Sequence, residues 1–172
     1  MLILLFVKFI MNRFSIILIV SVIIVFFSCK KYDDFSPIPE VSYESMELLT
    51  DNTFNSDYLN LSIKFIDGDG DICFYDNDTV KNIVFTLYYM ENDTLKPAEL
   101  AVPYKYKIPY YEPEGRNKLM KGSVKTKFYV DDFILLGYDT LKLDFQVFDR
   151  AYNKSNVGTT PLIIVSNYTK WK

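Results

Sequence analysis

An alternating run of aspartate and glycine at positions 67–71 has the clearest chemical potential in this sequence. Asp67, Asp69 and Asp71 place carboxylates at every second position, and the two glycines between them allow the backbone to turn so that these carboxylates converge. Hard carboxylate oxygens suit Ca²⁺ far better than they suit zinc or copper. The spacing therefore predicts a divalent cation site, with Ca²⁺ as the candidate ion.

Two other interpretations of this run stay open. A solvated Asp/Gly turn that binds no ion is common in β proteins. The run is not an EF-hand, because Ile72 stands where that loop requires glycine and Asp78 stands where it requires glutamate. Arg150 offers the second arrangement, an ion pair with a loop carboxylate that would form a purely structural clasp.

The composition excludes several kinds of catalytic site. The 172 residues include no histidine, which removes imidazole bases, Ser-His-Asp triads and HExxH zinc sites. Two cysteines cannot build a Cys₄ zinc site. The acid pairs Asp131–Asp132 and Glu112–Glu114 could in principle hydrolyse glycosides, but acids on a loop are usually only solvated. We therefore expect a protein that is not an enzyme.

Four tyrosines offer a different kind of binding surface. Tyr104, Tyr106, Tyr110 and Tyr111 gather among lysines and prolines, and exposed aromatic planes can stack on sugars. The alternative is that Tyr104 and Tyr106 share one face of a strand, for which tyrosine is well suited. Carbohydrate binding is thus the second functional hypothesis, beside a protein-binding or accessory module.

The elements that must position these residues have the period of strands. Alternation of apolar and polar residues, or a dense apolar run, predicts strands at 58–66, 82–90, 124–130, 140–149 and 157–165. A further strand starts at Val41 and changes phase before Met46, Pro161 marks an edge or a bulge, and residues 131–137 could form a short helical turn. About seven strands predict an all-β fold, an antiparallel β-sandwich over residues 40–172.

The sandwich is expected to be Ig-like or fibronectin-III-like but without a disulfide, because the Ig cysteine pair is missing and the only tryptophan is Trp171. In such a fold the loops that follow 58–66 and 140–149 lie at the same end. Asp149 would then supply a fourth oxygen to the ion, and Asn153 a fifth.

The N-terminal segment predicts export. Residues 1–28 contain no acidic residue, and an apolar run follows Arg13, which makes them a signal peptide with Met11 as a plausible true start. The segment 29–39 contains charges and two prolines, and reads as an extended tether. Without Lys8 and Arg13, 17 basic residues face 22 acidic ones, a formal charge of −5, which argues against a nucleic-acid partner.

The Phe-Phe-Ser-Cys sequence that ends at Cys29 resembles the lipobox of bacterial lipoproteins. The resemblance implies lipid attachment at Cys29, hence a membrane anchor. With this lipobox, the acidic run and the segment 147–156 taken together, the sequence resembles a group of small, mostly uncharacterised Bacteroidota lipoproteins with an Ig-like domain. That implies a lipid-anchored outer-membrane protein, on the periplasmic face or the cell surface, with an unknown protein or glycan partner.

Overall fold

The computed structural model describes residues 35–112 and 118–167. The predicted signal peptide and Cys29 lie outside these ranges. The described residues form nine strands, one α-helix and one 3₁₀ helix: β1 (Glu40–Asp51), β2 (Ser56–Asp67), β3 (Ile83–Glu91), β4 (Thr94–Pro97), β5 (Lys105–Tyr106), β6 (Met120–Tyr129), α2 (Val130–Leu136), β7 (Thr140–Val147), β8 (Gly158–Thr159), β9 (Ile163–Ile164) and η1 (Val165–Asn167).

The first sheet, sheet A, has the strand order β1-β2-β6, and both pairs of neighbours are antiparallel. The register between β1 and β2 shifts between Tyr43 and Ser45. Such an irregularity moves the following side chains to the other face of the strand. The phase change predicted before Met46 is therefore confirmed, and its cause is this shift in register.

The second sheet, sheet B, has the order β4-β3-β7-β8, with β5 pairing with β3 and β9 pairing with β7. Asn92 and Asp93 join β3 to β4 with φ angles of 49° and 57°. Positive φ at both central residues is typical of a tight hairpin turn, which asparagine and aspartate tolerate well. Asn92 and Asp93 therefore form the turn of a tight β-hairpin between β3 and β4.

The prediction of one continuous strand over residues 157–165 is wrong. Two short strands, β8 and β9, flank Pro161, and Val165 already belongs to a 3₁₀ helix. Thr160 keeps the broken segment against β7, because its amide donates to the Leu143 carbonyl and its hydroxyl accepts from the Leu143 amide. Pro161 has no amide to continue the ladder, which accounts for the interruption.

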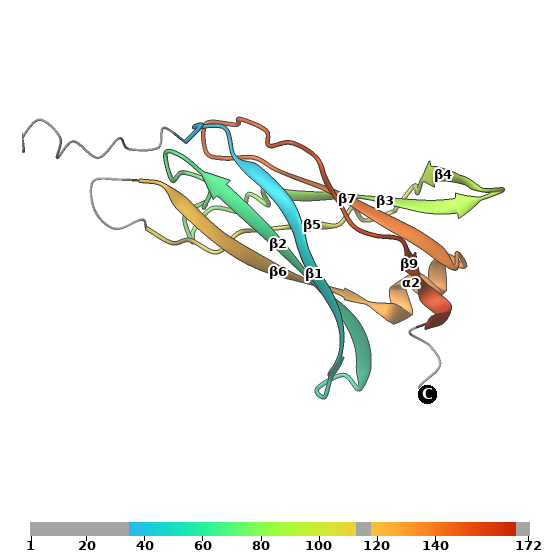
Figure 1. Ribbon diagram of the computed structural model, residues 1–172. Helices are drawn as coiled ribbons and strands as arrows, with labels where there is room; N and C mark the ends of the chain where they lie inside the picture. Colours follow the sequence, from blue (N-terminus) through green and yellow to red (C-terminus); the bar gives the residue numbers. More distant parts are fainter. Residues whose placement is uncertain (1–34, 113–117, 168–172) are drawn as a thin grey trace, which may run out of the picture. The chain divides into compact units, whose positions relative to one another are not determined.

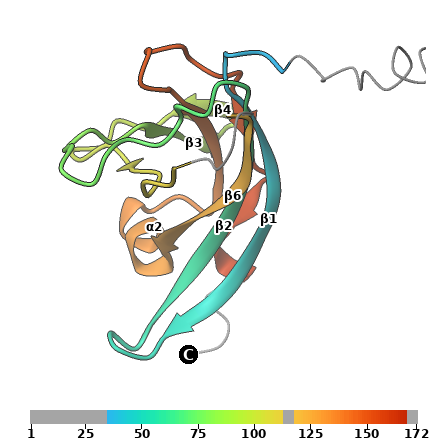
Figure 2. The same cartoon turned by 90° about the vertical axis from the view of Figure 1, so that its left-hand side faces the viewer.

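The two sheets pack together as a β-sandwich, as predicted (Figures 1 and 2). Aromatic side chains fill the space between them. The Phe128 ring of β6 makes an edge contact at 5.0 Å with the Phe85 ring of β3, and it is stacked at 6.2 Å on Phe133 of α2. This aromatic cluster occupies the interior that a disulfide and tryptophan hold in antibody domains.

The strand order corresponds to an Ig-like arrangement. The strands β1, β2 and β6 take the places of A, B and E, and β3, β7 and β8 take those of C, F and G. The helical turn predicted at 131–137 is confirmed as α2, which ends where Gly137 adopts a φ of 75°. Within the described ranges, the structure contains no helix that is long and apolar enough to span a membrane.

Candidate metal centre

The acidic run begins where β2 ends, and its first carboxylate is buried. Asp67 is 0% exposed. Its Oδ2 atom accepts a hydrogen bond from the Ile72 amide at 2.9 Å, but its Oδ1 atom has no hydrogen-bond partner. A buried carboxylate oxygen without a partner is costly, so its presence calls for a compensating group.

Two further carboxylates converge on Asp67. Ligand atoms of Asp67, Asp69 and Asp71 all lie within 4.8 Å of one another. The Oδ1 atom of Asp71 is also buried and without a hydrogen-bond partner. The convergence predicted from the alternating spacing is therefore present, and these three residues could hold a metal ion.

The electrostatics of the cluster disfavour its own negative charge. Burial, with a smaller contribution from the charges of Asp69 and Asp71, raises the pKa of Asp67 to about 7, although a hydrogen bond from the Ile72 amide acts in the opposite direction. Burial also raises the pKa of Asp71, as do the charges of Asp149 and Asp69. A bound cation would remove both the desolvation penalty and the mutual repulsion.

The end of the predicted tether lies against this loop. The Gly68 amide donates to the Ser36 carbonyl oxygen at 3.0 Å. A Cβ atom at Gly68 would lie 2.4 Å from that oxygen and 2.5 Å from the Phe35 carbonyl oxygen. Gly68 is therefore required by a close approach between two backbone segments. The compact unit accordingly starts at Phe35.

The loop that follows β7 meets the acidic loop, as the sandwich topology predicts. The Arg150 amide donates to the Asp71 carbonyl oxygen at 3.2 Å. Asp149 is buried, and its two oxygens accept hydrogen bonds from the Asn153 amide at 2.8 Å and the Asn153 side chain at 2.9 Å. Asp149 is thus close enough to raise the pKa of Asp71, but it lies outside the group of three converging carboxylates.

Arg150 forms a clasp of a different kind from the one expected. Its guanidinium donates to the Cys73 carbonyl oxygen at 3.1 Å and lies 4.8 Å from the centre of the Tyr75 ring. Among the ion pairs of residues 35–112 and 118–167, none joins Arg150 to a carboxylate. Because the Arg150 guanidinium bonds to a carbonyl oxygen, it leaves the Oδ1 atoms of Asp67 and Asp71 without a hydrogen-bond partner and available for a cation.

Asn82 holds the base of the site, and sequence patterns did not reveal it. This fully buried residue donates from Nδ2 to the carbonyl oxygens of Ile72 and Phe148, at 2.7 and 3.1 Å, and its Oδ1 accepts from the Ile108 amide at 3.0 Å. It therefore ties three chain segments together beneath the acidic loop. An asparagine directly before a dense apolar strand was the only signal available.

The four tyrosines do not form one exposed platform. Tyr104 and Tyr106 are half-buried with their rings edge-on to Phe128, at 5.2 and 5.7 Å. Burial raises the pKa of Tyr104 to about 12. Tyr110 packs on Tyr75, so Tyr111 alone among the four is largely exposed, at 61%. Sugar binding through these residues stays a prediction, which a glycan array and the Tyr104→Ala and Tyr110→Ala variants would test.

The remaining reactive residues are dispersed. Asp131 and Asp132 lie in the first turn of α2, where the positive end of the helix dipole stabilises carboxylates. Glu112 is exposed, and Glu114 lies outside the described residues. Cys73 is a buried free thiol whose Sγ atom lies 3.5 Å from the Met120 Sδ atom, as is typical of a small residue in the core.

Comparison with known proteins adds nothing to this geometry: no family model matches the chain, and neither a curated protein nor a solved structure matches it significantly. The site is therefore interpreted from its own residues.

Proposed function

We propose that the chain is a non-enzymatic, lipid-anchored protein of the outer membrane. Its Ig-like β-sandwich serves as a binding or accessory module, and its acidic loop holds Ca²⁺ as a structural brace. The observation that supports an ion site is the state of the Asp67 carboxylate. It is fully buried, its Oδ1 atom has no hydrogen-bond partner, and ligand atoms of two further carboxylates lie within 4.8 Å. An acidic cluster on an exposed turn would carry no such implication, because water would satisfy its oxygens.

Calcium is favoured over other metals by the donor set. The three side chains offer only oxygen, and Ca²⁺ accepts six to eight oxygen ligands in flexible geometry, with waters and carbonyls completing the shell. Zinc favours nitrogen and sulfur ligands at tetrahedral sites. The flexible shell suits a loop in which three ligands come from five consecutive positions.

The ion would act as a brace because three segments meet around it. Asp67 belongs to the end of β2. Gly68 is bonded to Ser36, and Asp71 is bonded to Arg150 through its carbonyl oxygen. Neutralising the carboxylates would therefore stabilise the contacts of the acidic loop with the N-terminal segment and with the loop after β7.

The anchor is supported by the sequence around Cys29. An apolar run ends in Ser28 and Cys29, and the folded unit starts only at Phe35, which leaves a short connection between lipid and domain. Two or more acyl chains on one cysteine would hold the protein stably on a membrane. The absence of histidine and the dispersal of the acid pairs support a role without catalysis.

A thermal melt in saturating Ca²⁺ and in EDTA tests the ion. Ca²⁺ at a concentration 100-fold above its Kd should stabilise the fold by about 2.7 kcal/mol and raise the Tm. Asp69→Asn should abolish the increase, whereas Asp76→Asn, at an exposed position after the cluster, should retain it. Identical melts in Ca²⁺ and EDTA would refute the site, and an equal response to Mg²⁺ would refute its selectivity.

Mass spectrometry of the membrane fraction tests the anchor. The mature protein should begin at Cys29 and carry acyl chains there. Cys29→Ser should leave the precursor unprocessed, whereas Cys73→Ser, at a buried core position, should not alter processing. Normal processing of the Cys29→Ser variant would contradict the proposal.

A further inference from the structure

Strand β6 forms an open edge of sheet A. Among the strands of residues 35–112 and 118–167, only β2 pairs with it, and on one side. The Tyr106 hydroxyl donates to the Lys127 carbonyl oxygen at 2.7 Å, so that carbonyl points away from β2. Backbone groups alternate in direction along a strand, so Ser123 and Lys125 also direct their amides and carbonyls outward. Within the part of the chain that the structure describes, no backbone hydrogen bond reaches either residue from outside the sheet.

A groove of about 540 Å³ lies along this open edge. Strand β6 forms one wall, and residues 106–111 form the other. The lining is largely apolar and includes Phe65, Cys73, Ile108, Met120 and Val124.

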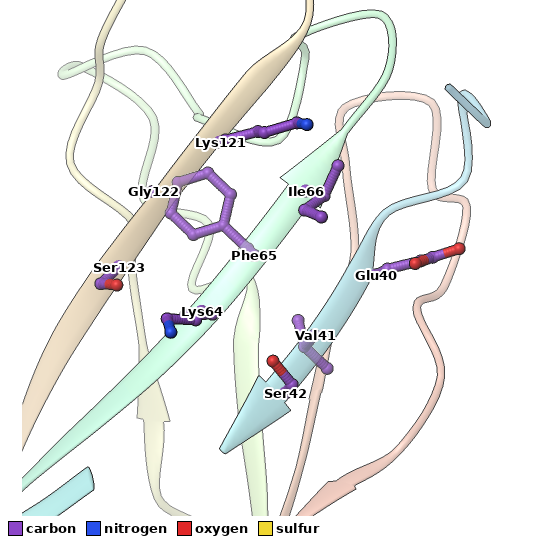
Figure 3. A pocket seen from close by; sticks show the side chains of 9 residues that line it. All are labelled: Glu40, Val41, Ser42, Lys64, Phe65, Ile66, Lys121, Gly122 and Ser123. Carbon is purple, nitrogen blue, oxygen red and sulfur yellow. The ribbon is translucent and has the colours of Figure 1, made fainter. Parts of the chain in front are cut away.

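Gly122 shapes the floor of this groove. It is the cross-strand partner of Phe65, and a Cβ atom at Gly122 would lie 2.9 Å from the Phe65 Cζ atom. Figure 3 shows the adjoining pocket over β1, β2 and β6, which shares Phe65 and Gly122 with the groove, and in this view the Phe65 ring lies over β6 at Gly122. Glycine thus lets an aromatic ring extend past the strand and reach the groove.

The rim of the groove is positively charged. Lys121 and Lys125 are exposed on β6, and neither belongs to an ion pair within the described residues, unlike Lys127, which pairs with Asp51. The Lys121 ammonium lies 3.9 Å from the centre of the Phe35 ring. The protein as a whole is acidic, so this positive rim favours an acidic ligand locally.

Lysines on an edge strand also discourage non-specific pairing, which is their usual role. That role explains the charges but not the apolar groove beside them. A second copy of the chain would place β6 against β6, and the lysines of the two copies would repel one another. An acidic strand would meet neither obstacle.

We propose that the β6 edge binds an extended, acidic segment of a partner protein. The segment adds to sheet A as a fourth strand, bonds to the backbone of Ser123 and Lys125, and places alternate apolar side chains in the groove. Acidic side chains on its other face meet Lys121 and Lys125. This inference rests on the proposed role as a binding module, but not on the ion or the lipid.

The test uses the full-length protein in mild detergent and a displayed library of peptides of about eight residues. Asp or Glu occupies alternate positions, and Val, Ile, Thr or Tyr occupies the others. Wild-type protein should enrich such peptides, and bound peptide should slow hydrogen exchange at Ser123 and Lys125. Ser123→Pro removes an outward amide without breaking the pairing with β2, and it should abolish enrichment. N-methylation of alternate peptide amides should do the same without altering the protein.

The double variant Lys121→Glu, Lys125→Glu tests the charges. It should weaken the binding of an acidic peptide on the order of tenfold and strengthen the binding of a peptide with lysine in place of the acidic residues. No enrichment over Ser123→Pro, or binding indifferent to N-methylation, would overturn the proposal. If light scattering shows a dimer that Ser123→Pro converts to a monomer, the ligand of this edge is a second copy of the chain and not an acidic segment. If a glycan protects the same amides from exchange, the ligand is a sugar. Calcium melts on the same samples separate the outcomes, because a retained calcium response without peptide binding refutes the docking edge alone.

Discussion

The side-chain amide of Asn82 donates to the carbonyl oxygen of Ile72 at 2.7 Å, and both residues are fully buried. Ile72 directly follows the three converging carboxylates, and its own amide donates to Asp67. An uncharged residue ten positions away therefore holds the backbone from which the acidic loop projects. The geometry of the charged site depends on this neutral contact as much as on the aspartates.

Asn82→Ala should lower the free energy of unfolding by about 3 kcal/mol or more. The change leaves the carbonyls of Ile72 and Phe148 and the amide of Ile108 buried without their partner, and each such group costs about 1–3 kcal/mol. Urea denaturation measures the loss. Asn77→Ala, at an exposed turn position, should change it by no more than about 0.5 kcal/mol. Equal stabilities for the two variants would show that the buried contacts are dispensable.

The metal-free protein should lose stability as the pH rises from about 4 to about 7. Burial raises the pKa of Asp67 to about 7 in the folded state, so the folded protein keeps a proton that the unfolded chain releases near pH 4. Between these values the unfolded state binds fewer protons, and the free energy of unfolding falls by up to about 1.4 kcal/mol per pH unit. Above pH 7 both states are ionised and this dependence ends.

Urea denaturation in EDTA at several pH values measures this slope. Asp67→Asn should flatten it, because an amide does not titrate, and should also abolish the response to Ca²⁺. Saturating Ca²⁺ should remove the decline in the wild-type protein, because the ion stabilises the ionised carboxylate. A wild-type slope that matches Asp67→Asn in EDTA would mean that Asp67 is ionised normally without metal.

The strands were predictable because burial imposes a period of two. The alternation at 140–149 appears in β7 as alternate buried and half-buried residues, and the phase change near Met46 reflects a real shift in register. The convergence of Asp67, Asp69 and Asp71 was also predictable, since alternate residues of a turning segment project toward one side. These features are local, so the sequence pattern contains them.

Contacts between distant segments were not predictable from local patterns. The bond between Asn82 and Ile72 and the approach of Ser36 to Gly68 depend on how the sheets meet. Tyr104 and Tyr106 have the residue type of a sugar platform, yet they face Phe128, because β5 packs over the interior. Arg150 has the charge for an ion pair, but carbonyl oxygens lie within its reach instead.

Phe128→Ala should destabilise the sandwich by about 3–5 kcal/mol, the usual cost of removing a buried aromatic ring. The ring is 2% exposed and contacts Phe85 across the two sheets. Thermal melting measures the loss. Phe54→Ala, at a ring that is 69% exposed in the turn after β1, is the matched control and should cost far less. A loss at Phe128 no larger than that at Phe54 would contradict the inter-sheet contact.

Gly68→Ala should detach the N-terminal segment from the acidic loop. The added Cβ atom would meet backbone atoms of Phe35 and Ser36 at 2.4–2.8 Å, and backbone cannot rotate away as a flexible side chain can. We expect a loss of about 1–3 kcal/mol, faster hydrogen exchange at residue 68 and a smaller stabilisation by Ca²⁺.

Gly137→Ala is the control that separates crowding from backbone strain. Gly137 has a φ of 75°, and a Cβ atom added there would have no neighbour within 4 Å, so alanine should cost about 1–2 kcal/mol through strain alone. It should leave the Ca²⁺ response and the exchange at Gly68 unchanged. If Gly68→Ala behaves like Gly137→Ala in both measurements, the segment around Ser36 does not support the loop. A reduced calcium response confined to Gly68→Ala would instead place the contact with Ser36 within the ion-binding structure, because the two variants share the same residue change and differ only in what the new methyl group meets.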